Sequence, residues 1–143
     1  MQRKIVSYVL LIIWLIIIFY LSDQSGLVSG ENSSGIIECF FELFALDNSL
    51  IEIIHEPLRE IMHIIEYLIL GFLMVNVLKN YKLKSYLTIS IMLCFIYSVT
   101  DEIHQAFVPS RTFQCFAILM DFIGIVVGSL IGNKMIKTYR NNL

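Results

Sequence analysis

The sequence predicts an all-α membrane protein, a bundle of four transmembrane helices with short amphipathic helices in the first outer loop. Of its 143 residues, 57% are hydrophobic and only 15% are charged, and the apolar residues gather in four long runs. An ordinary soluble domain carries roughly 25% charged residues. A single core of this size could not hide so much apolar surface from water. We therefore expect one membrane domain over residues 1–143.

Each of the four apolar runs approaches or exceeds the length needed to cross a bilayer, which is about 20 helical residues. The first run follows two basic residues, as a signal peptide would, but no small-residue cleavage site follows it, so we interpret it as a retained helix. The connections between the later runs are too short to hold folded domains. The expected spans are residues 5–21, 61–78, 86–107 and 116–132.

The basic residues predict the orientation, because cytoplasmic loops and tails are enriched in Lys and Arg. Eight of the ten bases lie before the first span, between the second and third spans, or after the fourth. The segment 23–60 instead carries eight acidic residues and one base, Arg59. We expect a multi-pass protein of the cell membrane with both termini in the cytoplasm and this segment outside.

The long outer segment contains two helix signals. In residues 35–45 the apolar side chains recur at helical spacing opposite two glutamates, which predicts an amphipathic helix at the membrane interface. Ser49 and Glu52 form a capping-box pattern that opens a second short helix, and Pro57 is expected to end or bend it. The two helices either form a lid over the bundle or wall a lipid-accessible cleft.

Ionisable residues of three spans are expected at one depth in the outer half of the membrane. At ~1.5 Å per residue, His63 and Asp101 lie ~22 Å from the basic ends of their helices, and Glu66 and Asp121 lie ~18 Å from theirs. A charged side chain that faces lipid costs roughly 2.5–3.5 kcal/mol or more, so these groups should face inward, pair with one another or line a wet cavity. The expected polar cluster, open to the outer side, consists of His63, Glu66, Asp101, Glu102, His104 and Arg111.

These residue types suit acid–base chemistry on an anionic ligand. Either His104 or His63 is a candidate acid or base. Arg111, between the third and fourth spans, has the planar guanidinium that binds phosphate or carboxylate through two hydrogen bonds. The pairs His63–Glu66 and Asp101–His104 also have the spacing of ligand pairs in metal-binding helical bundles. That reading stays an alternative, and we assign neither a metal ligand nor a cofactor.

Glycines recur every four residues along the fourth span, at Gly124, Gly128 and Gly132. This spacing lets a neighbouring helix approach closely, and the neighbour is either another helix of the same chain or a second copy. The sequence contains no phosphate-binding glycine loop, no hydrolase nucleophile elbow and no nucleic-acid-binding surface. We therefore expect no nucleic-acid partner.

Residues 101–111 read Asp-Glu-Ile-His-Gln-Ala-Phe-Val-Pro-Ser-Arg, which resembles the signature of VanZ-like bacterial membrane proteins. Matching pieces lie in the expected order over essentially the whole chain. The resemblance implies a small multi-spanning protein whose namesake is associated with resistance to teicoplanin-type glycopeptides. Two positions depart from the family: Ser110 replaces a usual Gly, and Ala117 replaces a usual Asp.

The residues and the resemblance together define the candidate site. The candidate catalytic residues are His63, Glu66, Asp101, Glu102 and His104. The candidate ligand-binding residues are Arg59, Tyr67, Gln105, Arg111, Asp121, Ser22 and Gln24.

Three functional hypotheses stay open, beside a polar network that only fixes helix packing. In the first, the protein is an enzyme that acts on a lipid-linked or anionic envelope substrate at the outer face. In the second, it binds an envelope lipid or a lipophilic antibiotic, such as a lipoglycopeptide, without catalysis. In the third, it is a metal-binding helical bundle. Membrane lipids are the expected partners, and two copies could pair through the glycines of the fourth span. If the carboxylate missing at Ala117 is needed for chemistry, the chain is a binding form, a divergent member or a deliberately altered variant.

Overall fold

A computed structural model describes residues 2–23, 49–81, 83–109 and 111–141, and this part of the chain is helical without strands. Its four long helices are α1 (Gln2–Ser22), α3 (Ser49–Leu78), α4 (Tyr86–Gln105) and α5 (Cys115–Asn141), and a short 3-10 helix, η1 (Lys79–Tyr81), follows α3. Each long helix contains a stretch long and apolar enough to cross a membrane. The predicted all-α, four-span class is confirmed.

Two helices continue beyond the residue ranges expected from the sequence. A helix begins at Ser49 as the capping box predicts, but it does not end at Pro57: α3 continues as one helix to Leu78 and includes the second span. A proline removes one backbone donor, yet the turns on either side can keep their own hydrogen bonds, so the helix continues through it. At the other end of the chain, α5 extends nine residues beyond the predicted end at residue 132. The amphipathic helix predicted at 35–45 lies outside the described residues.

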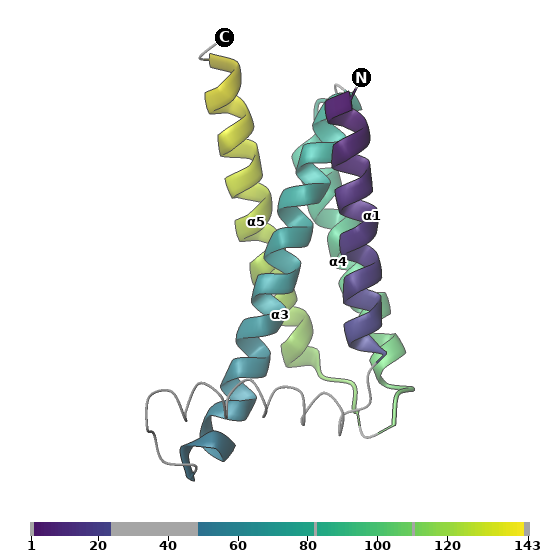
Figure 1. Cartoon of the computed structure of the whole chain (residues 1–143), viewed down its shortest axis with the longest axis vertical. Helices are drawn as coiled ribbons and strands as arrows, with labels where there is room; N and C mark the ends of the chain where they lie inside the picture. Colours follow the sequence, from purple (N-terminus) through teal and green to yellow (C-terminus); the bar gives the residue numbers. More distant parts are fainter. Residues whose placement is uncertain (1, 24–48, 82, 110, 142–143) are drawn as a thin grey trace.

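Helix α3 is the centre of the bundle. It makes its most extensive contact with α5, and it also contacts α4 and α1 (Figure 1). The N-terminus, the C-terminus and the connection from α3 to α4 lie at one end, which carries Lys4, Lys79, Lys84 and Lys134 and is called here the basic end. The opposite end, where α3 begins and α4 connects to α5, is called the site end. Both termini therefore lie on one side, as an even number of spans requires.

Glycines bring α3 and α5 into backbone contact. A Cβ atom added at Gly128 would lie 1.9 Å from the carbonyl oxygen of Leu68, and one added at Gly124 would lie 2.4 Å from that of Ile64. From the other side, a Cβ at Gly71 would lie 2.5 Å from the carbonyl oxygen of Ile125. The glycine pattern thus serves a helix pair within the chain, as small residues do in membranes. Pairing of two copies through these glycines stays a prediction.

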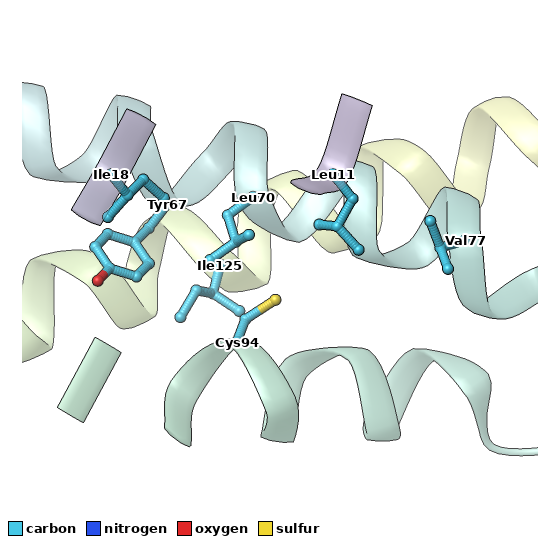
Figure 2. Close-up of a cluster of buried hydrophobic side chains, with 7 residues drawn as sticks. All are labelled: Leu11, Ile18, Tyr67, Leu70, Val77, Cys94 and Ile125. Carbon is cyan, nitrogen blue, oxygen red and sulfur yellow. The ribbon is translucent and has the colours of Figure 1, made fainter. Parts of the chain in front are cut away.

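The buried apolar cluster is small and runs along α3, as Figure 2 shows. Ile18 of α1 lies beside Tyr67 at one end of the cluster, while Leu11 lies toward Val77 at the other. The remaining apolar side chains of α1 are largely exposed, for example Ile16 at 62%. Such a surface suits acyl chains rather than water. The cluster consists of Leu11, Ile18, Tyr67, Leu70, Val77, Cys94 and Ile125.

Two aromatic side chains attach α1 to its neighbours through backbone carbonyls. The Trp14 indole N–H donates to the carbonyl oxygen of Glu66 at 3.0 Å, and the Tyr97 hydroxyl donates to that of Leu15 at 3.0 Å. Hydrogen bonds inside a bilayer meet no competition from water, although their measured net strength stays modest. They fix the middle part of α1 against α3 and α4.

Candidate functional site

A histidine, an aspartate and a serine from three helices meet toward the site end. Nδ1 of His63 on α3 lies 3.0 Å from Oδ1 of Asp121 on α5, and the Ser98 hydroxyl on α4 donates to Oδ2 of Asp121 at 2.7 Å. The side chains of Asp121 and His63 are 2% and 13% exposed. Both oxygens of the carboxylate therefore have a partner, as a buried carboxylate requires.

This meeting point follows from the helical period. On α4, the steps of four, four, three and four residues from Ser90 to Gln105 keep the small and polar side chains on one face, and that face is buried. On α5, Asp121 lies on the same face as the glycines that admit α3. The buried residues of α4 are Ser90, Cys94, Ser98, Asp101, Glu102 and Gln105.

A second group of hydrogen bonds leads from the interior to the loop after α4. The Tyr67 hydroxyl and the Gln105 amide both donate to Oδ2 of Asp101, each at 3.1 Å. The Arg111 guanidinium in turn donates through Nη1 to Oε1 of Gln105 at 2.8 Å. Asp101 thus orients Gln105, and Gln105 holds the arginine of the loop. Tyr67, Gln105 and Arg111, all predicted as ligand-binding residues, are linked in one chain.

Glu66 is within electrostatic range of both hydrogen-bonded groups. Its charge interacts with those of His63 and Asp121 in one group and with those of Asp101 and Arg111 in the other. The structure therefore brings five of the predicted site residues of three helices and one loop within electrostatic range of one another. What these residues do chemically stays a prediction.

Glu102 is held by the backbone at the start of α5. It is 2% exposed, and its Oε1 accepts a hydrogen bond of 2.6 Å from the backbone N–H of Gln114, the residue before α5. Together with Gln105, which binds Arg111, it ties the loop 106–114 to the last turn of α4. The contact gives Glu102 a role in positioning the loop, and its catalytic role stays a prediction.

His104 faces α1 rather than the His63–Asp121 pair. Its ring stacks on Phe19, with 5.1 Å between the ring centroids, and its Nε2 lies 3.4 Å from Oδ1 of Asp23 without hydrogen-bonding geometry. The side chain is 36% exposed. Residues 104 and 105 point about 100° apart on a helix, so Gln105 turns inward while His104 turns toward α1. The cluster predicted to include His104 is thus divided.

The other predicted residues and the metal alternative have different outcomes. Ser22 is buried, and its hydroxyl has no hydrogen-bond partner among the described residues. Gln24 and the side chain of Arg59 lie outside the described part.

Within the described part of the chain, no three His, Cys, Asp or Glu side chains are placed to hold a metal ion. The metal-bundle alternative therefore has no ligand set there.

Sequence reasoning missed Ser98 and Gln114 as partners of the site. A signal for Ser98 was present, because it lies three residues before Asp101 on a face that otherwise carries Ser90 and Cys94. A serine among apolar residues of a span reads equally well as a small packing residue. Gln114 takes part through its backbone N–H, which no side-chain pattern reveals.

Comparison with known proteins gives one match. A family model described as VanZ/LLP1 matches residues 7–136, which include the last three candidate spans, the first span from Ser7 onward and every site residue described above. No curated protein and no solved structure matches the chain.

Proposed function

The chain belongs to the VanZ/LLP1 family, and from this premise we propose that it acts at the outer face of the cytoplasmic membrane on a lipid-linked or anionic cell-envelope ligand. We propose that this action contributes to resistance against glycopeptide or lipoglycopeptide antibiotics. The observation that carries the proposal is the His63–Asp121–Ser98 contact. Ionisable groups within spans are costly and mark ligand or proton pathways.

The geometry supports a proton-transfer role for His63. When Nδ1–H donates to Asp121, the neutral imidazole keeps the lone pair on Nε2. Asp121 fixes this tautomer and the ring orientation, and Ser98 fixes Asp121. With 13% of its side chain exposed, His63 can take a proton from a hydroxyl group or water and return it to a leaving group.

Arg111 supplies the recognition of an anion. Its link through Gln105 to Asp101 holds the guanidinium at the site end. A guanidinium carries five N–H donors in a planar fork, so one hydrogen bond to Gln105 is compatible with a second contact to a phosphate or carboxylate. An anionic headgroup bound there would lie near the side chains that interact with Glu66.

A non-catalytic binding protein is the second candidate, and Ala117 favours it. This residue is 3% exposed and lies one helical turn before Asp121. Members of the family that the sequence resembles usually carry an aspartate at this position. A methyl group cannot accept a proton or orient a histidine, so this chain could hold a ligand with the same residues without converting it.

The test uses the full chain in phosphatidylcholine vesicles that contain a polyprenyl phosphate as the probe. Binding is measured by titration of the probe, and turnover by mass spectrometry of the recovered lipid. Arg111→Lys keeps the charge but loses the fork, so we expect its affinity to fall about tenfold, which is about 1.4 kcal/mol. Arg3→Lys, at the basic end, is the matched control.

His63→Gln separates the two candidates. If the protein is an enzyme, this variant loses turnover and still binds the probe. If the parent binds without turnover, the protein is a binder. The outer-site proposal fails if Arg111→Lys and Arg111→Ala both bind the probe like the parent and both leave teicoplanin susceptibility of the cells unchanged.

A further inference from the structure

The loop between α4 and α5 exposes large apolar side chains on a fixed backbone. Phe107 is 83% exposed, and Phe113 is 47% exposed. Phe116, in the first turn of α5, is 56% exposed. Yet the loop is ordered by its own hydrogen bonds, such as that from the Val108 N–H to the Gln105 carbonyl at 3.0 Å.

Side chains of α4 hold the same loop in place. Glu102 binds the Gln114 N–H, Gln105 binds Arg111, and Val108 is 8% exposed. The phenylalanines therefore point outward from a structure that is anchored inward at three points. In water, three such side chains would form a costly apolar surface around a single arginine.

The lengths of α4 and α5 place this loop at the edge of the hydrocarbon core. Helix α4 begins two residues after Lys84 and has 20 residues, or about 30 Å. Helix α5 has 19 residues from Cys115 to Asn133, before Lys134, or about 28 Å. A tilt of about 20° shortens both distances across the membrane by a few per cent. Because the core is about 30 Å thick, helices that start at the basic boundary reach the other boundary without extending beyond it.

We propose that residues 106–109 and 111–114, with Phe116, form a membrane-interfacial loop whose partner is the lipid leaflet opposite the basic end. Phe107, Phe113 and Phe116 enter the boundary between headgroups and acyl chains, as aromatic side chains at membrane surfaces do. The positive charge of Arg111 lies beside them, where it complements the lipid phosphates. The loop is also continuous with the lipid-facing surfaces of the two spans that it joins.

The position of the loop also constrains the ligand. This further step rests on the proposed function, whereas the position of the loop is independent of it. A headgroup bound by Arg111 would arrive sideways from the leaflet with its chains still in the bilayer. The substrate class is then an anionic amphiphile rather than a free anion from water.

Depth-dependent fluorescence quenching tests the placement of the loop. Trp14 is the single tryptophan, so Phe107→Trp and Phe113→Trp are each made in a Trp14→Phe background. Each full-length variant is placed in phosphatidylcholine vesicles brominated at different acyl positions. We expect blue-shifted emission that is quenched most by shallow bromines and weakly by aqueous iodide. Ile16→Trp, which is exposed in the middle of α1, should be quenched most by deep bromines and serves as the depth control.

Two results would overturn the inference. Quenching by iodide but not by bromolipid would place the loop in water. Protection from both quenchers would mean that protein, from this chain or a second copy, covers the phenylalanines. Trp14→Phe removes the hydrogen bond to the Glu66 carbonyl, so the same loop variants are also made with Trp14 retained. For the variants that retain Trp14, the emission spectrum of the unsubstituted protein is subtracted from that of each variant. The quenching profile of the loop tryptophan obtained in this way must agree with the profile measured in the Trp14→Phe background.

Discussion

His63 and Asp121 are 58 residues apart in the chain, yet their side chains are joined at 3.0 Å across α3 and α5. The contact depends on the backbone packing beside it. Gly124 lies three residues after Asp121, and α3 approaches there so closely that a Cβ would lie 2.4 Å from the carbonyl oxygen of Ile64, the residue after His63. The glycines that join the two helices therefore also bring the imidazole within reach of the carboxylate.

Asp121→Asn should show what the negative charge of this carboxylate contributes, because asparagine has nearly the same shape. Asparagine fills the same space and can still accept from Ser98 through its amide oxygen, but it loses the charged partner of His63. We expect the free energy of unfolding to fall by about 1–3 kcal/mol and any turnover to fall by roughly 100-fold or more. Thermal denaturation in detergent and the vesicle assay measure the two effects. Ser98→Ala removes one neutral donor and should lower the free energy of unfolding by only about 1 kcal/mol. If both variants lose the same free energy of unfolding, the negative charge of Asp121 is not what stabilises the contact.

Gly128→Ala should be strongly destabilising, because the added methyl group would lie 1.9 Å from the Leu68 carbonyl oxygen and 2.9 Å from its Cα. Backbone atoms cannot relieve the overlap by changing rotamer as a side chain can, so α5 must move away from α3. We expect a loss of about 1–3 kcal/mol or more. Gly132→Ala is the matched control, since its nearest neighbours lie 3.3 Å away. Chemical denaturation of both variants tests the difference, and equal stabilities would contradict the observed helix contact.

The four spans could be predicted from composition because a bilayer imposes its thickness on every helix that crosses it. For the same reason, counting residues from the basic ends placed His63, Asp101 and Asp121 close in depth, and the structure brings their helices together there. The continuation of α3 past Pro57 could not be predicted in this way. A proline weakens a helix without deciding whether the neighbouring turns stay helical.

The rotation of side chains about each helix was harder to predict than their depth. His104 and Gln105 both lie within four residues of Asp101, and only contacts with neighbouring helices decide that Gln105 binds Asp101 while His104 stacks on Phe19. Similarly, the sequence shows the carboxylate of Glu102, a candidate acid or base, but not the backbone N–H of Gln114 that it binds.

The orientation of the bundle stays a prediction from the basic residues, and cysteine labelling tests it. In a variant without its native cysteines, single cysteines are placed near Lys82, after Arg140 and near Asn48. If both termini are cytoplasmic, an impermeant maleimide added to intact cells should label only the site near Asn48. Labelling near Lys82 from outside would refute the predicted orientation, and labelling of all three sites in permeabilised cells is the control.

Glu102→Gln and Glu102→Ala distinguish positioning from acid–base chemistry. Glutamine keeps an oxygen that can accept from the Gln114 N–H, whereas alanine leaves that donor without its partner, at a cost of about 1–3 kcal/mol. If Glu102 positions the loop, the glutamine variant should bind and convert ligand nearly like the parent, and the alanine variant should lose affinity. Loss of turnover in both variants, with binding retained in Glu102→Gln, would support the predicted catalytic role of Glu102.

Ala117→Asp is the most informative substitution because Ala117 is buried one turn before Asp121 on the same face of α5. Residues four apart on a helix are neighbours about 6 Å apart at Cβ, so the new carboxylate would extend the polar group formed by Asp121, Ser98 and His63. We expect the variant to fold, since those side chains and the nearby Gln114 region offer polar partners. Leu119→Asp, at a position of the same span that is 51% exposed on the surface of the bundle, should instead fail to insert stably.

The activity of the folded Ala117→Asp variant then decides between the two candidate functions. A carboxylate at this position can stabilise a protonated histidine or fix its orientation, which a methyl group cannot do. Turnover that rises in Ala117→Asp but not in Ala117→Asn, which adds similar bulk without charge, supports catalysis by this site. Unchanged affinity for the polyprenyl phosphate without turnover in all three proteins supports a binder. If Ala117→Asp fails to insert as Leu119→Asp does, the face of α5 that carries Ala117 cannot host a charge, and the site must be placed elsewhere.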